Sequence, residues 1–115
     1  MATSAKVTSS TVNNQTSLEI WEVILNNSSI KFFKPLLVVP TLLDQGTPGE
    51  CYFAECPEIG LSAVGVDLEE LSSCLRSDIR MTWKRIVQTH DNELSSHDRN
   101  IKRRFLELAE EIHDG

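Results

Sequence analysis

The triplet Cys56-Pro57-Glu58 places a thiol close to a carboxylate and is the first candidate for chemistry. A reactive thiolate needs a nearby cation or a helix N-terminus to lower its pKa, and the triplet supplies neither. The same residues also mark the exit of a strand, because Pro57 cannot donate to a β-ladder and Glu58 stays in water. We therefore interpret the triplet as structural, and keep a small enzyme that uses Cys56 as a rival hypothesis.

The other cysteines and the histidines do not form a metal-binding pattern. Cys51 and Cys56 lie near each other, but a structural zinc site also needs a second closely spaced ligand pair, which is missing. On a strand these two cysteines would also face opposite sides. The motifs of a nucleophile elbow, a dinucleotide-binding loop and a P-loop are absent. The sequence therefore predicts no catalytic residue, no metal and no cofactor, and a protein that is not an enzyme.

The bulk composition favours one acidic domain. The chain has 115 residues and a net charge of −6, from 11 Lys and Arg against 17 Asp and Glu. Negative charge repels nucleic-acid phosphates, so DNA binding is not favoured, whereas ordinary solubility and a basic partner both fit. We find no secretory signal, no apolar run of membrane-spanning length and no disulfide framework. We therefore expect a cytoplasmic protein without membrane contact.

The N-terminal part of the chain is polar and then ambiguous. Residues 1–15 are rich in Ser, Thr and Asn, which predicts a flexible tail before a single domain over 16–115. The segment 16–27 fits either a short helix or a strand. Its acids Glu19 and Glu22 lie three apart, which is a helical spacing, whereas its β-branched residues favour a strand. We favour the helix.

Three strands and two helices are predicted for the remaining chain. The strands cover 36–43, 50–56 and 61–66, with turn-forming Gly and Pro residues between them. A long helix begins at Asp67, whose carboxylate caps the amide of Glu70 while Glu70 reaches back. After a polar break, a last helix covers 97–113. The apolar faces of the two helices consist of Leu68, Leu71, Leu75, Ile79, Trp83 and Ile86, and of Ile101, Phe105, Leu108 and Ile112.

These elements predict an α+β fold in which a small three-stranded antiparallel sheet packs against a long helix, with an extra C-terminal helix and a short N-terminal helix or strand. On the long helix, Arg76, Arg80 and Lys84 form a row at steps of four. This row fits a solvated face that complements the helix dipole, and it is also the candidate contact for a partner. The cluster 102–104 is a weaker candidate for DNA phosphates, because its helix carries as many acids.

The order of elements over about residues 36–86 resembles that of the HicB-like antitoxin domain family. The chain departs from the family pattern at three places. Asp67 replaces the family's threonine cap, and Leu71 replaces its small alanine. Ile59 is followed directly by Gly60, where the family commonly has Pro-Gly, so one residue is missing. A DNA-binding segment of the kind found in full-length members is not recognisable. The residues that carry the resemblance are Tyr52-Phe53-Ala54-Glu55-Cys56-Pro57-Glu58-Ile59, Gly60-Leu61-Ser62-Ala63 and Gly65-Val66-Asp67-Leu68-Glu69-Glu70-Leu71.

The resemblance implies binding rather than catalysis, because an antitoxin of this family masks a small, basic, RNA-cleaving toxin. We therefore expect a non-enzymatic, HicB-like protein-binding module that neutralises such a toxin and forms a homo-oligomer. The alternative is an orphan protein of the same fold that acts as a scaffold or regulator for an unknown partner. The net charge of −6 suits the first hypothesis without deciding between them.

Overall fold

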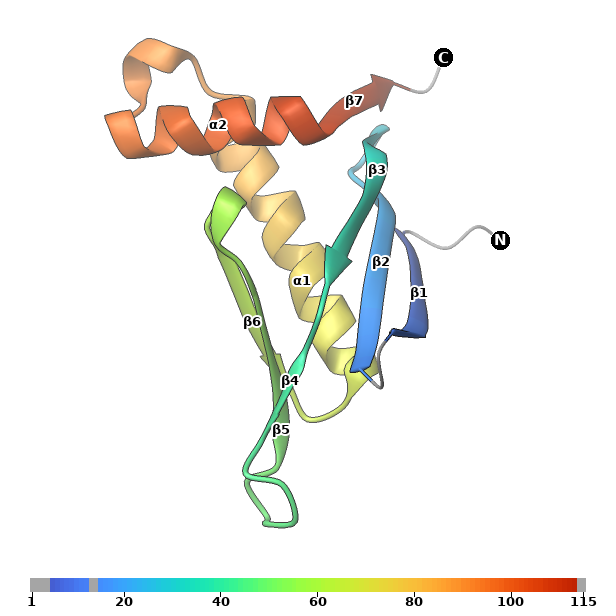
Figure 1. Ribbon diagram of the computed structural model, residues 1–115. Helices are drawn as coiled ribbons and strands as arrows, with labels where there is room; N and C mark the ends of the chain where they lie inside the picture. Colours follow the sequence, from blue (N-terminus) through green and yellow to red (C-terminus); the bar gives the residue numbers. More distant parts are fainter. Residues whose placement is uncertain (1–4, 13–14, 114–115) are drawn as a thin grey trace.

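The computed structural model describes residues 5–12 and 15–113, and it has a mixed α+β fold built around two antiparallel sheets (Figure 1). The larger sheet has the strand order β1-β2-β3-β7, and the smaller one has the order β4-β5-β6. The larger sheet consists of β1 (Ala5–Val12), β2 (Gln15–Ile24), β3 (Ser28–Val38) and β7 (Ala109–His113). The smaller sheet consists of β4 (Thr41–Leu43), β5 (Cys51–Cys56) and β6 (Leu61–Gly65).

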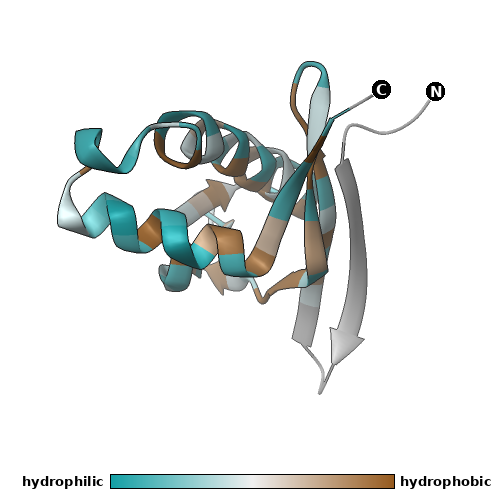
Figure 2. Cartoon of the chain, turned by 90° about the horizontal axis from the view of Figure 1, so that it is seen from above, coloured by the Kyte–Doolittle hydropathy of each residue, from teal (hydrophilic) through white to brown (hydrophobic). Residues whose placement is uncertain are grey.

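Helical segments cover one side of the strands. In Figure 1, α1 runs behind both sheets and α2 lies across its upper end. Both helices carry hydrophilic and hydrophobic residues on different sides (Figure 2). No helix in the described residues combines the length and apolar character needed to cross a membrane. The segments are the 3-10 turn η1 (Pro57–Ile59), α1 (Leu68–Thr82), the π-helical η2 (Trp83–Val87), the 3-10 turn η3 (Asp91–Glu93) and α2 (Ser96–Leu108).

The small sheet and α1 form the part of the fold that the sequence predicts correctly. β5 and β6 pair antiparallel, so every second residue of each strand points toward the helix. On the helix side, Ala54 and Ala63 are buried against Leu71, Leu75 and Ile79, which are fully buried. The strand predicted for 36–43 is divided, because β3 ends and β4 begins on either side of a break that includes Pro40.

Asp67 begins α1 as its N-cap. Its Oδ1 accepts a hydrogen bond of 2.8 Å from the backbone amide of Glu70, which is the capping contact predicted from the sequence. The return contact differs from an ordinary capping box, because Glu70 Oε1 accepts from the amide of Val66 and not from that of Asp67. The two carboxylates therefore fix the path of the chain from β6 into the helix.

The helix favoured for 16–27 is wrong, because this segment forms β2. Leu18 and Ile20 are buried, and the next buried positions are Val23 and Leu25. The step of three between the two pairs comes from a bulge at Trp21, which is an extra residue on β2 between the β1 pairs Val7–Ile20 and Lys6–Glu22. Since a bulge resets which residues face the core, a strand acquires the three-residue spacing that otherwise indicates a helix.

The flexible tail predicted for 1–15 also needs correction. Residues 5–12 form β1, which pairs antiparallel with β2. Its polar composition cannot support a core, but an outer strand is held by backbone hydrogen bonds to its neighbour and needs little apolar surface. Residues 1–4 and 13–14, which also fall within the predicted tail, lie outside the described residues.

The last predicted helix, over 97–113, ends early. α2 stops at Leu108, and the next five residues form β7, which pairs with the first half of β3. Ile112, which the helical pattern places on the apolar face, is 39% exposed. The apolar spacing continues past the true helix end, and the open edge of β3 competes for these residues because it offers backbone partners.

The carboxylate of Glu111 joins β7 to β3 and to the end of α1. Ser28 Oγ and Trp83 Nε1 each donate to it at 2.8 Å, and Gln88 Nε2 donates at 3.1 Å. Partial burial raises the pKa of Glu111, but the three hydrogen bonds outweigh this effect and hold the pKa below its usual range. Trp83 in turn packs edge-on against Phe105 of α2, with ring centroids 5.7 Å apart.

Candidate protein-binding surface

The partner contact predicted at Arg76, Arg80 and Lys84 stays a prediction. All three lie on the α1–η2 segment, but Arg80 is partly buried and its Nε donates a 2.9 Å hydrogen bond to the carbonyl of Ile24. This contact ties the helix to β2. Lys84 is exposed and Arg76 is half-buried.

The Arg80 contact leads to a stability prediction. Replacing Arg80 by methionine is expected to lower the free energy of unfolding by about 1 kcal/mol, because the Ile24 carbonyl loses a charged donor. The Arg76→Met change removes an equal charge from the same helix and is expected to stay within about 0.5 kcal/mol of the parent. Urea unfolding of the two variants makes the comparison. Equal losses would show that Arg80 acts only through helix charge.

Cys56 is buried at the end of β5, in surroundings that disfavour its thiolate. Burial raises the pKa of its thiol to about 11, and the negative charges of Glu58 and Glu55 act in the same direction. Pro57 then opens η1, and Gly60, at a φ of 68°, ends it. The triplet is therefore a turn after a strand, as its composition predicts. The described residues contain no group of three or more His, Cys, Asp or Glu side chains placed to hold a metal ion.

The raised pKa of Cys56 can be checked by alkylation. At pH 7 iodoacetamide is expected to label Cys51 and Cys74, which are partly exposed, well before Cys56. The labelling rate of Cys56 is expected to rise about tenfold per pH unit until the pH nears 11, since only the thiolate reacts. Mass spectrometry of timed digests measures each rate. Rapid labelling of Cys56 at neutral pH would restore the nucleophile hypothesis.

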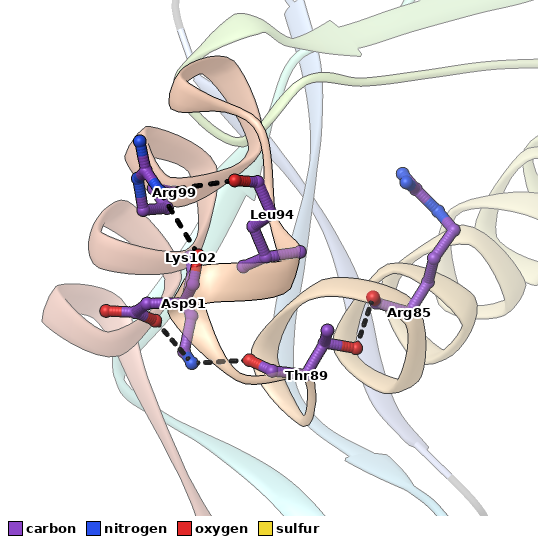
Figure 3. Close-up of polar contacts among 6 residues, drawn as sticks. All are labelled: Arg85, Thr89, Asp91, Leu94, Arg99 and Lys102. Atoms are coloured by element: carbon purple, nitrogen blue, oxygen red, sulfur yellow. Dashed lines mark hydrogen bonds and ion pairs between the residues drawn. The ribbon is translucent and has the colours of Figure 1, made fainter.

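Asp91, Arg99 and Lys102 are among the residues that line a hollow of about 650 Å³ beside α2. Figure 3 shows the polar contacts of these three residues. Lys102 Nζ lies 2.8 Å from Asp91 Oδ1 and donates to the Thr89 carbonyl at 2.7 Å. The hydrogen bond from Lys102 to the Asp91 carboxylate, together with the positive charge of Lys102, lowers the pKa of Asp91. Arg99 donates to the carbonyls of Asp91 and Leu94. These cations hold the connection between α1 and α2 in place, so Lys102 is not free to meet a phosphate.

A row of exposed apolar side chains lies on the outer side of the sheets, away from the core. Four of these side chains follow the chain from β3 into β4 and are spaced by even numbers of residues, which places them on the same face. They are Phe33, Leu37, Val39 and Leu43, which are 59%, 57%, 47% and 39% exposed. Val64 on β6 is 52% exposed and extends the row across the small sheet. We call these five residues the outer apolar stripe. Grouped apolar residues on a surface mark interaction sites more often than scattered ones do.

The part of the chain that forms the small sheet and the start of α1 is strongly acidic. Residues 35–75 contain seven Asp and Glu and no Lys or Arg, so this segment carries −7, and the ten acids and eleven bases elsewhere leave +1. All seven carboxylates are exposed, on β5, on η1, on the turn before β5 and at the start of α1. The net charge of −6 therefore conceals a strong separation. The seven are Asp44, Glu50, Glu55, Glu58, Asp67, Glu69 and Glu70.

This surface was not predicted from the sequence. Its acidic stretch can be recognised in the sequence, whereas its outer apolar stripe cannot be recognised without the strand boundaries. The absence of bases between Lys34 and Arg76 is visible by inspection. The outer apolar stripe needs the strand boundaries, since alternation assigns a face only when the strand is known to start at Ser28. No family model, curated protein or solved structure matches the sequence.

Proposed function

We propose that this protein is a non-enzymatic binding module that holds a small, basic protein against the outer side of its sheets. The charge separation carries the proposal: the −7 segment includes the whole small sheet, which also carries Leu43 and Val64 of the outer apolar stripe. Protein interfaces commonly combine an apolar centre with a charged rim, and complementary charge speeds encounter and rejects wrong partners. A basic surface with its own apolar centre is the complement.

The proposed biological role is that of an antitoxin that neutralises a small, basic RNase. The resemblance of residues 36–86 to the HicB-like domain family supports this role, and an acidic face that competes with RNA for the basic surface of such an enzyme is a simple way to block it. We propose that the homo-oligomer forms through a different surface, because two copies that met through their −7 segments would repel each other.

The test is co-expression with a small, basic RNase of the toxin type. We expect a complex that survives purification, dissociates as salt is raised, and relieves any growth arrest caused by the partner alone. The double variant Glu55→Lys with Val64→Lys is expected to lose the complex, since it inverts a charge on β5 and removes exposed apolar surface on β6.

The matched control is Met81→Lys with Glu93→Lys. It makes the same change in charge and also replaces an exposed apolar residue, 64% exposed in the case of Met81, but on the helical side of the molecule. This variant is expected to bind and rescue like the parent. Failure of the parent to form a complex or rescue growth would refute the proposed function, and equal loss in both variants would refute the surface.

A further inference from the structure

β3 carries a bulge of several residues that leaves part of the strand without a pairing strand. Four residues, 32–35, stand opposite the single residue Trp21 of β2. On the other edge, β7 pairs with β3 only as far as Phe32. Within residues 5–12 and 15–113, no strand pairs with 33–35 on either edge. Bulges of this kind redirect side chains and are common beside binding sites.

The bulge forms one wall of a groove of about 480 Å³. Residues 32–37 of β3 line this wall, and the opposite side consists of Glu58 from η1 with Glu107 and Leu108 from α2. Phe33 and Leu37 belong to the outer apolar stripe, so the groove lies at the end of the stripe nearest α2.

The chemistry of the groove is apolar with a negative balance. Its walls are mainly apolar, from Phe32, Phe33, Pro35, Leu36, Leu37 and Leu108. Two exposed carboxylates, Glu58 and Glu107, share the groove with one cation, Lys34. A ligand that presents an apolar side chain next to a Lys or Arg fits this lining.

We propose that this groove binds an extended segment of the basic partner, in which an apolar residue lies next to a Lys or Arg. The segment runs along the unpaired part of β3, continuing the edge that β7 covers from Ser28 to Phe32. The apolar side chain enters between Phe33 and Leu108, and the cation meets Glu58 or Glu107. The inference rests on the proposed function, since it deepens the contact with the same partner.

Both the shape and the charge of the groove favour a peptide segment over a second copy of this chain. An extended segment can use backbone groups of the bulge that no strand in the described chain occupies, although Pro35 offers no N–H. A second copy would bring its own −7 segment close to Glu58, which belongs to the −7 segment of the first copy. Charge complementarity selects a basic segment.

The experiment uses the full chain and a phage-displayed library of random short peptides as the probe. Selected peptides are expected to share an apolar residue adjacent to Lys or Arg. A synthetic copy of the best peptide is expected to shift the NMR signals of 33–37 and of Leu108. Glu58→Lys combined with Glu107→Lys is expected to weaken its affinity about tenfold or more, as expected for lost charge-assisted contacts. Glu93→Lys with Asp98→Asn serves as the control and is expected to leave affinity within about twofold.

The outcomes separate this inference from the proposed function. No enrichment, or binding that the groove variant leaves unchanged, would overturn the inference. A partner complex that is lost in Glu55→Lys with Val64→Lys but kept in the groove variant would overturn the inference and support the proposed function. Peptide binding in the groove without any complex with the small, basic RNase would refute the proposed function alone.

Discussion

Replacing Gly65 by alanine is expected to lower the free energy of unfolding by about 3 kcal/mol or more, the upper range for overpacking. Gly65 ends β6 directly below the first turn of α1. A Cβ added there would collide with the backbone N of Leu71 and would lie 2.8 Å from its Cα and 3.0 Å from the carbonyl O of Asp67. These atoms are backbone and cannot rotate away, so the strand and helix must separate.

Gly49→Ala is the matched control for Gly65→Ala. Its added Cβ would lie 3.6 Å from the nearest atom, a side-chain oxygen of Asp44, which is an ordinary contact. The control is expected to stay within about 0.5 kcal/mol of the parent. Circular dichroism in urea measures both. A Gly65→Ala protein as stable as the control would mean that β6 and α1 do not approach as closely as described.

Replacing Trp83 by alanine is expected to cost about 4 kcal/mol, within the range for removing a large buried aromatic side chain. Trp83 is 1% exposed, packs on Phe105 and donates to Glu111. Trp83→Phe keeps most of the ring packing and loses the indole N–H, so its cost is expected to be about 1 kcal/mol. Thermal unfolding followed by circular dichroism gives the order of the variants.

The control and the pH dependence sharpen this prediction. Trp21→Ala removes the other tryptophan, which is 40% exposed, and is expected to cost far less. The pKa of Glu111 is lowered in the folded state, so its contribution is present above the unfolded pKa and is lost as the pH falls through the folded pKa. Trp83→Phe removes one of the donors that lower this pKa, so the folded and unfolded pKa values of Glu111 move closer together. The variant is therefore expected to lose less stability than the parent as the pH falls through this range. Unchanged acid sensitivity would rule out the Trp83–Glu111 contact.

The sequence predicts those elements whose local signals agree with their surroundings. Asp67 and the leucines at steps of three and four identify α1, because cap, period and charge all indicate one helix. β2 could not be predicted, because the bulge at Trp21 imitates a helical spacing. β7 could not be predicted either, because it depends on an edge of β3 more than seventy residues away along the chain, as in the pair Phe32 and Ala109.

The candidate surface also has one part that can be predicted from the sequence and one part that cannot. The acidic half of the surface lies in the sequence itself, as a stretch of 35–75 without a base. The groove could not be predicted, because it needs the approach of Leu108 on α2 to Phe33 on β3, and that approach follows from where the chain turns into β7. The contact role of the row Arg76, Arg80 and Lys84 stays a prediction, and its spacing could not show that Arg80 donates to the Ile24 carbonyl.

The pairing of β7 with β3 determines the order in which parts of the fold can form while the chain is being synthesised. The small sheet and α1 draw on residues 41–82, which contact one another over short stretches of chain and can assemble as soon as they leave the ribosome. The outer edge of β3 at Ser28 to Phe32 must wait until residue 113 has been made, since its strand and the carboxylate of Glu111 arrive last. A nascent chain that stalls before Ala109 therefore displays an unpaired strand edge, the kind of surface that chaperones cover and that aggregates recruit.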